Sequence, residues 1–269
     1  MIPLQREKFP DSKAALADAM DESLRQFVHK DERVVSINSR VFPYLDEIAI
    51  NFDGAKLEAR PPAPPTAVGE TKSACETALL TLSARKVSVQ GAPVNVQLEA
   101  RDVVFHEGRD ADGKLLLLVK SVRTGNIVIS ASQLDLEHAI GQVAQREARK
   151  NGINIEQTRV SLRARGPRSI SADVRLEARK LLFRAKIDIS GQLHVDDEFV
   201  ARISNLICKG EGAVGSIACG ILDPHLRKLE GQTFSLMSLP LGEVKLRDVR
   251  IAVGDTVEMS ADFGSAQEA

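Results

Sequence analysis

The fold is decided by residues 159–190, RVSLRARGPRSISADVRLEARKLLFRAKIDIS, in which apolar and charged side chains alternate. Three successive segments of this stretch place Val, Leu, Ala or Ile at every second position, mostly with Arg, Lys, Asp or Glu between them. Successive side chains of a β-strand point to opposite faces of its sheet. The alternation therefore predicts strands that share one apolar face and one charged face, and the apolar face needs a cover.

Helices are predicted on both sides of this region, and the second of the two can supply the cover. One begins after Ser132, which can cap it together with Asp135, and ends near Gly152. The other spans residues 216–229, where Pro224 marks a kink or a restart. Both carry aliphatic residues at helical spacing, as expected of helices that pack one apolar stripe against a sheet.

The N-terminal part of the chain is predicted to begin with an amphipathic helix over residues 11–29. Asp11 or Ser12 can cap it, and its apolar residues recur at helical spacing. Residues 60–73 contain the sequence PPAPP and show no periodicity. We expect an exposed loop there, because Pro cannot donate the hydrogen bonds that a central strand needs.

Strands are expected in most of the remaining chain. A change of phase near Asp102 predicts a bulge, Asp112-Gly113 suits a hairpin turn, and a closing hairpin is expected to start at Leu239-Pro240. The order of helices and strands shows no βαβ alternation, which indicates an antiparallel sheet and the α+β class. We interpret residues 1–269 as a single domain.

The formal net charge of -1 conceals an excess of positive charge in residues 159–186, which hold nine basic side chains against two acidic ones. This segment is either a solvated sheet face or a surface that meets anions. Aromatic residues make up only 4% of the chain, which argues against binding of single-stranded nucleic acid by base stacking. We therefore expect no nucleic-acid partner.

Common catalytic and metal-binding motifs are missing from the sequence. No GxSxG, HExxH or GK[ST] sequence occurs, and the five His residues are scattered singly. Cys75, Cys208 and Cys219 form no CxxC motif, and we interpret them as neutral thiols, or as a Cys208–Cys219 disulfide if the chain is exported. We expect neither catalysis nor a cofactor, although a Ser/His/Asp cluster formed in space would change that interpretation.

Membrane-spanning and secretory segments are not expected. The N-terminal sequence MIPLQREKFPDSK has no apolar core of a signal peptide. The longest apolar run, residues 115–119, is far shorter than the ~20 residues that cross a bilayer. We therefore expect a cytoplasmic protein whose membrane contact, if it has one, is peripheral.

Three segments resemble the LmeA-like phospholipid-binding proteins, a family similar to the tubular lipid-binding superfamily that includes BPI-like domains. They are VVSINSRVFPYLDEIAINFDGAKLE (34–58), ISASQLDLEHAI (129–140) and ILDPHLRKLEGQTFSLMSLPLGEVKLRDVRIAVGDTVEMSADFG (221–264). The resemblance implies a long curved antiparallel sheet wrapped around amphipathic helices, with a lipid-lined groove and no catalytic residues. Members of the family are often exported or anchored by an N-terminal segment.

These patterns lead to a candidate site that binds an acyl-chain lipid, such as a phospholipid or a fatty acid, at a membrane surface. Transfer of the lipid is a second expected activity of the same site. The predicted apolar lining consists of Leu136, Ile140, Val143, Leu162, Ala172, Val174, Leu176, Phe183, Ile187, Leu222 and Leu226. The side chains predicted to meet anionic headgroups at a membrane surface are Arg163, Arg165, Arg175 and Arg179. The alternative is a scaffold with a dry core that binds a protein partner through its arginine-rich face.

Overall fold

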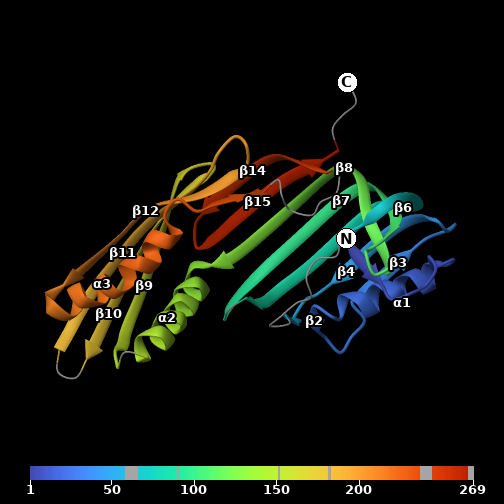
Figure 1. Ribbon diagram of the computed structural model, residues 1–269. Helices are drawn as coiled ribbons and strands as arrows, with labels where there is room; N and C mark the ends of the chain where they lie inside the picture. The colour runs from blue at the N-terminus through green and yellow to red at the C-terminus, as the bar shows by residue number, and fades with distance from the viewer. Residues whose placement is uncertain (58–65, 90, 151, 181–182, 237–243, 266–269) are drawn as a thin grey trace.

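The computed structural model describes residues 1–57, 66–89, 91–150, 152–180, 183–236 and 244–265. Within these ranges the chain forms three helices, two large sheets and a short two-stranded ribbon (Figure 1). The helices are α1 (Lys13–Leu24), α2 (Gln133–Arg149) and α3 (Gly212–Leu229). The α+β class predicted from the sequence is confirmed.

One large sheet has eight strands and lies on the α1 side of the molecule (Figure 1). Its order is β14-β15-β8-β7-β6-β4-β3, and β1 pairs with β8. The strands are β1 (Ile2–Leu4), β3 (Val35–Asn38), β4 (Tyr44–Asn51), β6 (Val68–Val89), β7 (Ala92–Arg109), β8 (Leu115–Ser132), β14 (Lys245–Val253) and β15 (Thr256–Gly264). The main core lies between α1 and this sheet, where Leu16 and Met20 of the helix are fully buried.

The second large sheet has five strands in the order β13-β12-β11-β10-β9, and its helices are α2 and α3. The strands are β9 (Asn154–Gly166), β10 (Ser169–Lys180), β11 (Phe183–Val195), β12 (Val200–Glu211) and β13 (Thr233–Ser235). Both helices face the apolar side of this sheet, and a small core of Leu176, Ala178, Ile187 and Ala218 lies beneath them. The amphipathic strands of residues 159–190 thus receive the predicted helical cover.

The prediction of one wholly antiparallel sheet is wrong. Strand β4 runs parallel to β6, with Ile48 opposite Leu80. Parallel neighbours need a crossover connection, and residues 52–67 between the two strands are long enough to return the chain to the same end. The described strands also divide into two large sheets and the ribbon of β2 and β5.

Several contacts join the two large sheets where β14 meets the turn between β9 and β10. The Ile251 N–H donates a hydrogen bond of 2.6 Å to the Pro167 carbonyl oxygen. The neighbouring Arg168 forms ion pairs with Asp248 at 3.0 Å and with Asp197 at 2.9 Å. Its guanidinium also lies 5.3 Å from the centre of the Phe199 ring, a cation–π distance. Arg168 therefore holds the five-stranded sheet against the edge of the larger one.

The boundaries of two predicted segments need correction. Residues 60–65 of the predicted loop lie outside the described residues, but Val68 and the residues up to Ser73 belong to β6. They pair with the end of β7, with Val68 opposite Arg109, and their side chains are exposed, so no apolar alternation marked them as a strand. The expected start of the closing hairpin at Leu239-Pro240 also lies outside the described part of the chain.

Of two local predictions along the long strands, the hairpin turn is confirmed and the bulge is confirmed only in its approximate position. The turn after Arg109 is closed by a hydrogen bond of 3.0 Å from the Gly113 N–H to the Asp110 carbonyl oxygen. Near Asp102, which has a positive φ of 49°, the register between β7 and β8 shifts between Val104 and Phe105. The positive φ marks an irregularity at the predicted position, but the extra residue of the register shift is Lys120 of β8, on the partner strand.

Helix α1 is shorter than the predicted range of 11–29. It is capped by Ser12, whose hydroxyl accepts a hydrogen bond from the Ala15 N–H, but it ends at Leu24. Val28 then enters a two-residue strand, β2 (Val28–His29), which pairs with β5 (Lys56–Leu57). The prediction was too long because Phe27 and Val28 continue the apolar spacing of the helix. They do pack against the core, but not in a helical conformation.

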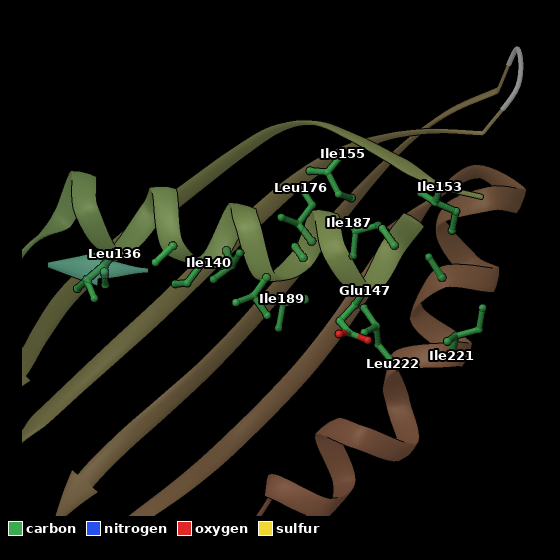
Figure 2. A pocket seen from close by; sticks show the side chains of 17 residues that line it. Leu136, Ile140, Glu147, Ile153, Ile155, Leu176, Ile187, Ile189, Ile221 and Leu222 are labelled. Carbon is green, nitrogen blue, oxygen red and sulfur yellow. The ribbon is translucent and has the colours of Figure 1, made fainter. Parts of the chain in front are cut away.

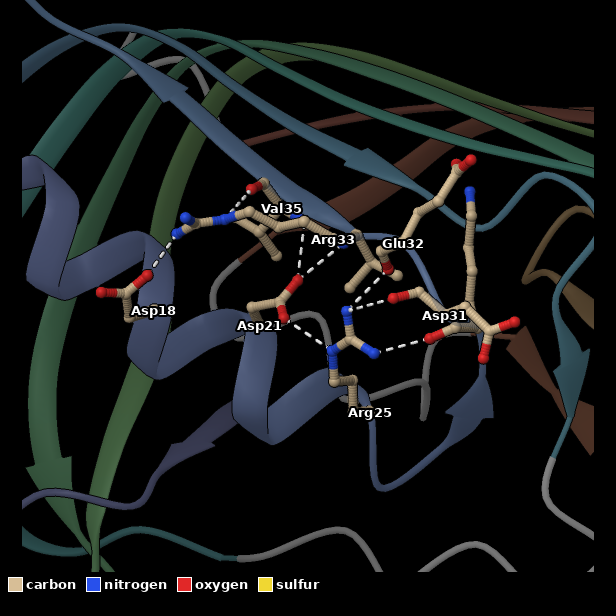
Figure 3. Close-up of polar contacts among 9 residues, drawn as sticks. Asp18, Asp21, Arg25, Asp31, Glu32, Arg33 and Val35 are labelled. Atoms are coloured by element: carbon tan, nitrogen blue, oxygen red, sulfur yellow. Dashed lines mark hydrogen bonds and ion pairs between the residues drawn. The ribbon is translucent and has the colours of Figure 1, made fainter.

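A hydrogen-bond network at the end of α1 directs the chain out of the helix (Figure 3). Arg25 forms an ion pair of 2.7 Å with Asp21 and donates to the carbonyl oxygens of Lys30 and Glu32. The other carboxylate oxygen of Asp21 accepts from the N–H groups of Val34 and Val35. Partial burial raises the pKa of the Asp21 carboxyl, but the bonds from Arg25 and the two N–H groups outweigh this and lower its pKa overall.

Replacement of this carboxylate tests whether the network stabilises the fold. Asp21→Asn should lower the free energy of unfolding by about 1 to 3 kcal/mol at neutral pH, the usual effect of losing hydrogen bonds to a charged group. A lowered pKa in the folded state adds stability above the ordinary value of 3.8, and this stability is lost as the pH falls through the folded-state pKa. Urea unfolding at a series of pH values should show the two proteins converging in acid.

Asp18→Asn is the matched control for that experiment. Asp18 also pairs with an arginine, Arg33, at 2.6 Å, but both side chains are more than half exposed. Exposed pairs contribute little, so the cost should stay below about 0.5 kcal/mol. Equal effects of the two substitutions, or an Asp21→Asn effect that does not change with pH, would contradict the assignment.

Candidate functional site

An open groove of about 790 Å³ lies between α2 and α3 on the apolar face of the five-stranded sheet (Figure 2). Seventeen residues line it. From α2 come Leu136, Ala139, Ile140, Val143, Ala144, Glu147 and Ala148; from the connection to β9 comes Ile153; from the sheets Ala92, Ile155, Val174, Leu176, Ile187 and Ile189; from α3 Ala218, Ile221 and Leu222. Sixteen of these side chains are apolar, and Glu147 is the exception.

The floor of the groove follows from the pairing of β10 with β11. Leu176 lies directly opposite Ile187, and Val174 lies opposite Ile189, so four aliphatic side chains form two adjacent rows. The row of Leu176 and Ile187 is buried below 10% exposure, while Ile221 at the α3 wall is 46% exposed. The groove therefore has a closed aliphatic floor and an open mouth.

The position of α2 is fixed by its N-terminal cap, by its close approach to β9 at one glycine, and by hydrogen bonds to the edge of β9. Ser132 caps the helix by accepting a hydrogen bond from the Asp135 N–H, as predicted. Gly141 packs so closely on β9 that an added Cβ would lie 3.0 Å from the Thr158 hydroxyl. The edge of β9 is also bonded to the helix, because Gln145 accepts from the Ile155 N–H at 2.6 Å. These contacts bind α2 along an otherwise open sheet edge.

Helix α3 begins earlier than predicted, at Gly212, and continues through Pro224 without a restart. The glycine-rich residues 210–215, which match no nucleotide-binding motif, have a packing role. A Cβ on Gly210 would lie 2.1 Å from the Gly215 carbonyl oxygen, so only glycine lets the first turn of α3 approach the end of β12 this closely. The second wall of the groove is thereby placed against the sheet.

A disulfide between Cys208 of β12 and Cys219 of α3 also fastens this wall. Cys219 lies between the groove residues Ala218 and Leu222 in sequence, and Cys208 pairs with the groove residue Ile189. The interpretation as neutral thiols is therefore wrong for Cys208 and Cys219, which form the bridge, whereas Cys75 is a buried thiol. Disulfides of this kind are typical of chains that fold in an oxidising compartment.

Seven of the predicted lining residues line this groove: Leu136, Ile140, Val143, Val174, Leu176, Ile187 and Leu222. Leu162, Ala172 and Leu226 do not line it. Leu162 packs against the main core instead, because β9 and β10 pass from the groove toward the larger sheet along their length. The side chain of Phe183 lies outside the described part of the chain.

The four predicted headgroup arginines project from the sheet on the side away from the groove, as period-2 geometry requires. Three of them form ion pairs: Arg163 with Asp173, Arg175 with Asp188 at 2.7 Å, and Arg179 with Glu156 at 3.2 Å. Arg165 donates a hydrogen bond to the Ser171 hydroxyl. Much of the positive charge of this face is therefore balanced by cross-strand carboxylates.

Sequence reasoning missed Glu147 and the small residues of the groove. Glu147 lies four residues after Val143, on the same helical stripe as Ile140 and Val143. Its position facing the groove could therefore have been predicted from the helical spacing. Ala144 and Ala148 give no signal in a sequence, because alanine is common in any helix. Their short side chains nevertheless leave the space that the groove occupies.

A second hollow of about 990 Å³ lies on the opposite side of α2, against β9, and it is polar. Its lining includes Glu137, Gln145, Arg146 and Arg149. Glu137 accepts a hydrogen bond from the Val160 N–H, so part of this lining serves to bond the helix to the sheet edge. Its polar side chains make it unsuited to hold a hydrocarbon.

Comparison of the chain with protein-family models, with curated proteins and with solved structures finds no match. In the part of the chain that the structure describes, no helix is long and apolar enough to cross a bilayer. The described residues also contain no cluster of three or more His, Cys, Asp or Glu side chains placed to hold a metal ion. The groove itself is the feature that carries a functional interpretation.

Thiol counting tests the bridge that holds α3. Cys75 is buried, and burial raises the pKa of its thiol to about 12, so the native protein should show no thiol reactive at about pH 8. Unfolding without reductant should reveal one thiol, and unfolding after reduction three. Reduction should also cost about 2 to 3 kcal/mol of stability. Three reactive thiols without reductant would contradict the disulfide.

Proposed function

We propose that the chain is a non-catalytic lipid-binding protein that holds an acyl chain in the groove between α2 and α3. The observation that carries the proposal is an open groove whose lining is aliphatic at sixteen of seventeen positions. Apolar surface in contact with water is unfavourable, and a hydrocarbon that covers it is favoured in proportion to the area buried. An aliphatic lining without aromatic rings suits a flexible chain better than a planar ligand.

The size of the groove supports the same ligand class. A volume of about 790 Å³ lies within the range of roughly 300 to 1,000 Å³ that is common for small-molecule sites. Residues 136 to 147 of α2 extend over roughly 17 Å at ~1.5 Å per residue, which matches an elongated ligand. Burial of a chain of about sixteen carbons could contribute roughly 12 kcal/mol at ~0.8 kcal/mol per CH₂, before ordering and association costs reduce it.

The tubular lipid-binding architecture and the delivery of the lipid to a membrane are part of this proposal. The resemblance to LmeA-like proteins supports both, and one mixed and one antiparallel sheet, each with helices on its apolar face, are compatible with them. Membrane contact would be peripheral. The Cys208–Cys219 disulfide favours an oxidising compartment over the cytoplasm expected from the sequence.

The arginine-rich face is proposed as the surface that meets an anionic membrane. Each basic side chain near such a surface contributes about 1 kcal/mol of attraction, but Arg163, Arg175 and Arg179 are already paired with carboxylates. Arg165, which contacts a hydroxyl, is the strongest of the four candidates. The alternative, a scaffold that binds a protein partner through this face, would leave the open groove without a role.

Two tryptophan substitutions on α2 test the groove directly. Ala144 lines the groove and Arg146 lies on the other side of the helix. Ala144→Trp should abolish uptake of a fluorescent fatty acid with a loss of stability below about 1 kcal/mol, because the ring has space, whereas overpacking a dry core costs about 1 to 3 kcal/mol. Arg146→Trp, the matched control, should retain uptake.

A second experiment, sedimentation with lipid vesicles, separates the role of the groove from that of the charged face. Arg165→Glu should weaken binding to anionic vesicles at low salt and leave fatty-acid uptake intact, because the two faces are independent. If the unmodified protein takes up no lipid, and Ala144→Trp instead unfolds it, the scaffold interpretation holds. Equal binding to neutral and anionic vesicles would remove the membrane role of the arginines alone.

A further inference from the structure

The one charged side chain in the groove lining is Glu147, near the C-terminal end of α2. Figure 2 shows its carboxylate directed across the groove toward Leu222 of α3. Lys150, one turn further along, forms an ion pair of 2.6 Å with it. A carboxylate with an ammonium group beside it therefore borders the apolar groove, whose lining continues past it to Ile153 and Ile221.

This pair is accessible to a ligand. The side chain of Glu147 is 56% exposed and that of Lys150 is 65% exposed, so both reach the surface of the molecule. An exposed pair is held weakly, and its partners can exchange for groups of a ligand at little cost. The basic residues Arg146 and Arg149 of the same helix line the polar hollow on its other side. Glu147 therefore supplies the charged group of the groove lining, and Lys150 lies beside it.

A carboxylate in the wall of an acyl-chain groove discriminates among headgroups. It accepts strong hydrogen bonds from an ammonium group and repels a carboxylate or phosphate that lacks a nearby cation. Lys150 offers the opposite charge one turn away, where a phosphate could reach it. A headgroup with both charges complements both side chains, whereas a purely anionic one complements only Lys150.

We propose that Glu147 and Lys150 form a headgroup subsite that selects acyl lipids with a zwitterionic headgroup, an ammonium joined to a phosphate, over purely anionic ones. This inference rests on the proposed function, because it requires that the acyl chain lies in the groove. It assigns the headgroup to the groove side of the sheet, whereas the sequence pointed to the arginines on the opposite face. Those arginines remain candidates for contact with the membrane surface, not with the bound lipid.

A set of lipids with one identical acyl chain tests the subsite. Lysophosphatidylethanolamine, lysophosphatidic acid and the free fatty acid would compete with a fluorescent monoacylglycerol for the full-length protein. The zwitterionic lipid should bind about five- to tenfold more tightly than lysophosphatidic acid, as expected of one charge-assisted hydrogen bond gained and one repulsion avoided. Glu147→Gln should reduce this preference to about twofold or less, and Glu147→Lys should reverse it.

Asp223→Asn is the matched control. Asp223 is a half-exposed carboxylate on α3 that pairs with Arg227 at 2.7 Å and lies outside the groove lining. Its replacement changes the net charge as Glu147→Gln does and should leave the headgroup preference unchanged. A loss of preference in both variants would assign the effect to overall charge and would overturn the subsite.

The outcomes also distinguish the subsite from the groove. Equal affinities for all three lipids, or a preference for lysophosphatidic acid in the unmodified protein, would overturn the headgroup assignment while acyl-chain binding stands. Failure of the fluorescent monoacylglycerol to bind at all would overturn the proposed function and the subsite together. A preference that survives both Glu147→Gln and Glu147→Lys would show that other groups read the headgroup.

Discussion

The apolar face of the five-stranded sheet has to be shielded from water, and the rest of the candidate site depends on how that is done. Strict alternation along β9, β10 and β11 gives the sheet this face. Helix α2 lies over β9 and α3 lies over β11 and β12, so the helices stand at two sides of the face. The strip between them is floored by Leu176 and Ile187 and bordered by small residues. Because the two helices cover only part of the apolar face, a groove remains between them. Helices that covered the whole face would leave a dry core.

Each wall of the groove is held by a different kind of contact. The wall formed by α2 depends on side chains of the helix that accept hydrogen bonds from the free edge of β9, and on the close approach at Gly141. The wall formed by α3 depends on the Gly210–Gly215 contact and on the Cys208–Cys219 disulfide. The sheet between them is in turn fixed to the larger sheet through Arg168. The groove can therefore stay open without a ligand to support it.

Much of this arrangement could be predicted from the sequence, because period-2 and helical patterns report which face of an element is apolar. The stripe of Leu136, Ile140 and Val143 was placed correctly on this basis. The patterns do not report which apolar cluster a residue joins. Leu162 continues the alternation of β9 but packs against the main core, and only the three-dimensional course of the strand decides this. Ion pairs such as Arg175 with Asp188 depend on strand register, which the sequence alone left undefined.

The position of a bound acyl chain is the most direct test of the account. Stearic acid with a spin label on its chain, added to protein with isotope-labelled isoleucine methyl groups, would broaden the NMR signals of the methyl groups close to it. The account predicts strong broadening for Ile189 and Ile221 in the groove and none for Ile48 and Ile50, which are buried in the main core. Broadening confined to the main core, or no selective broadening at saturating ligand, would contradict it.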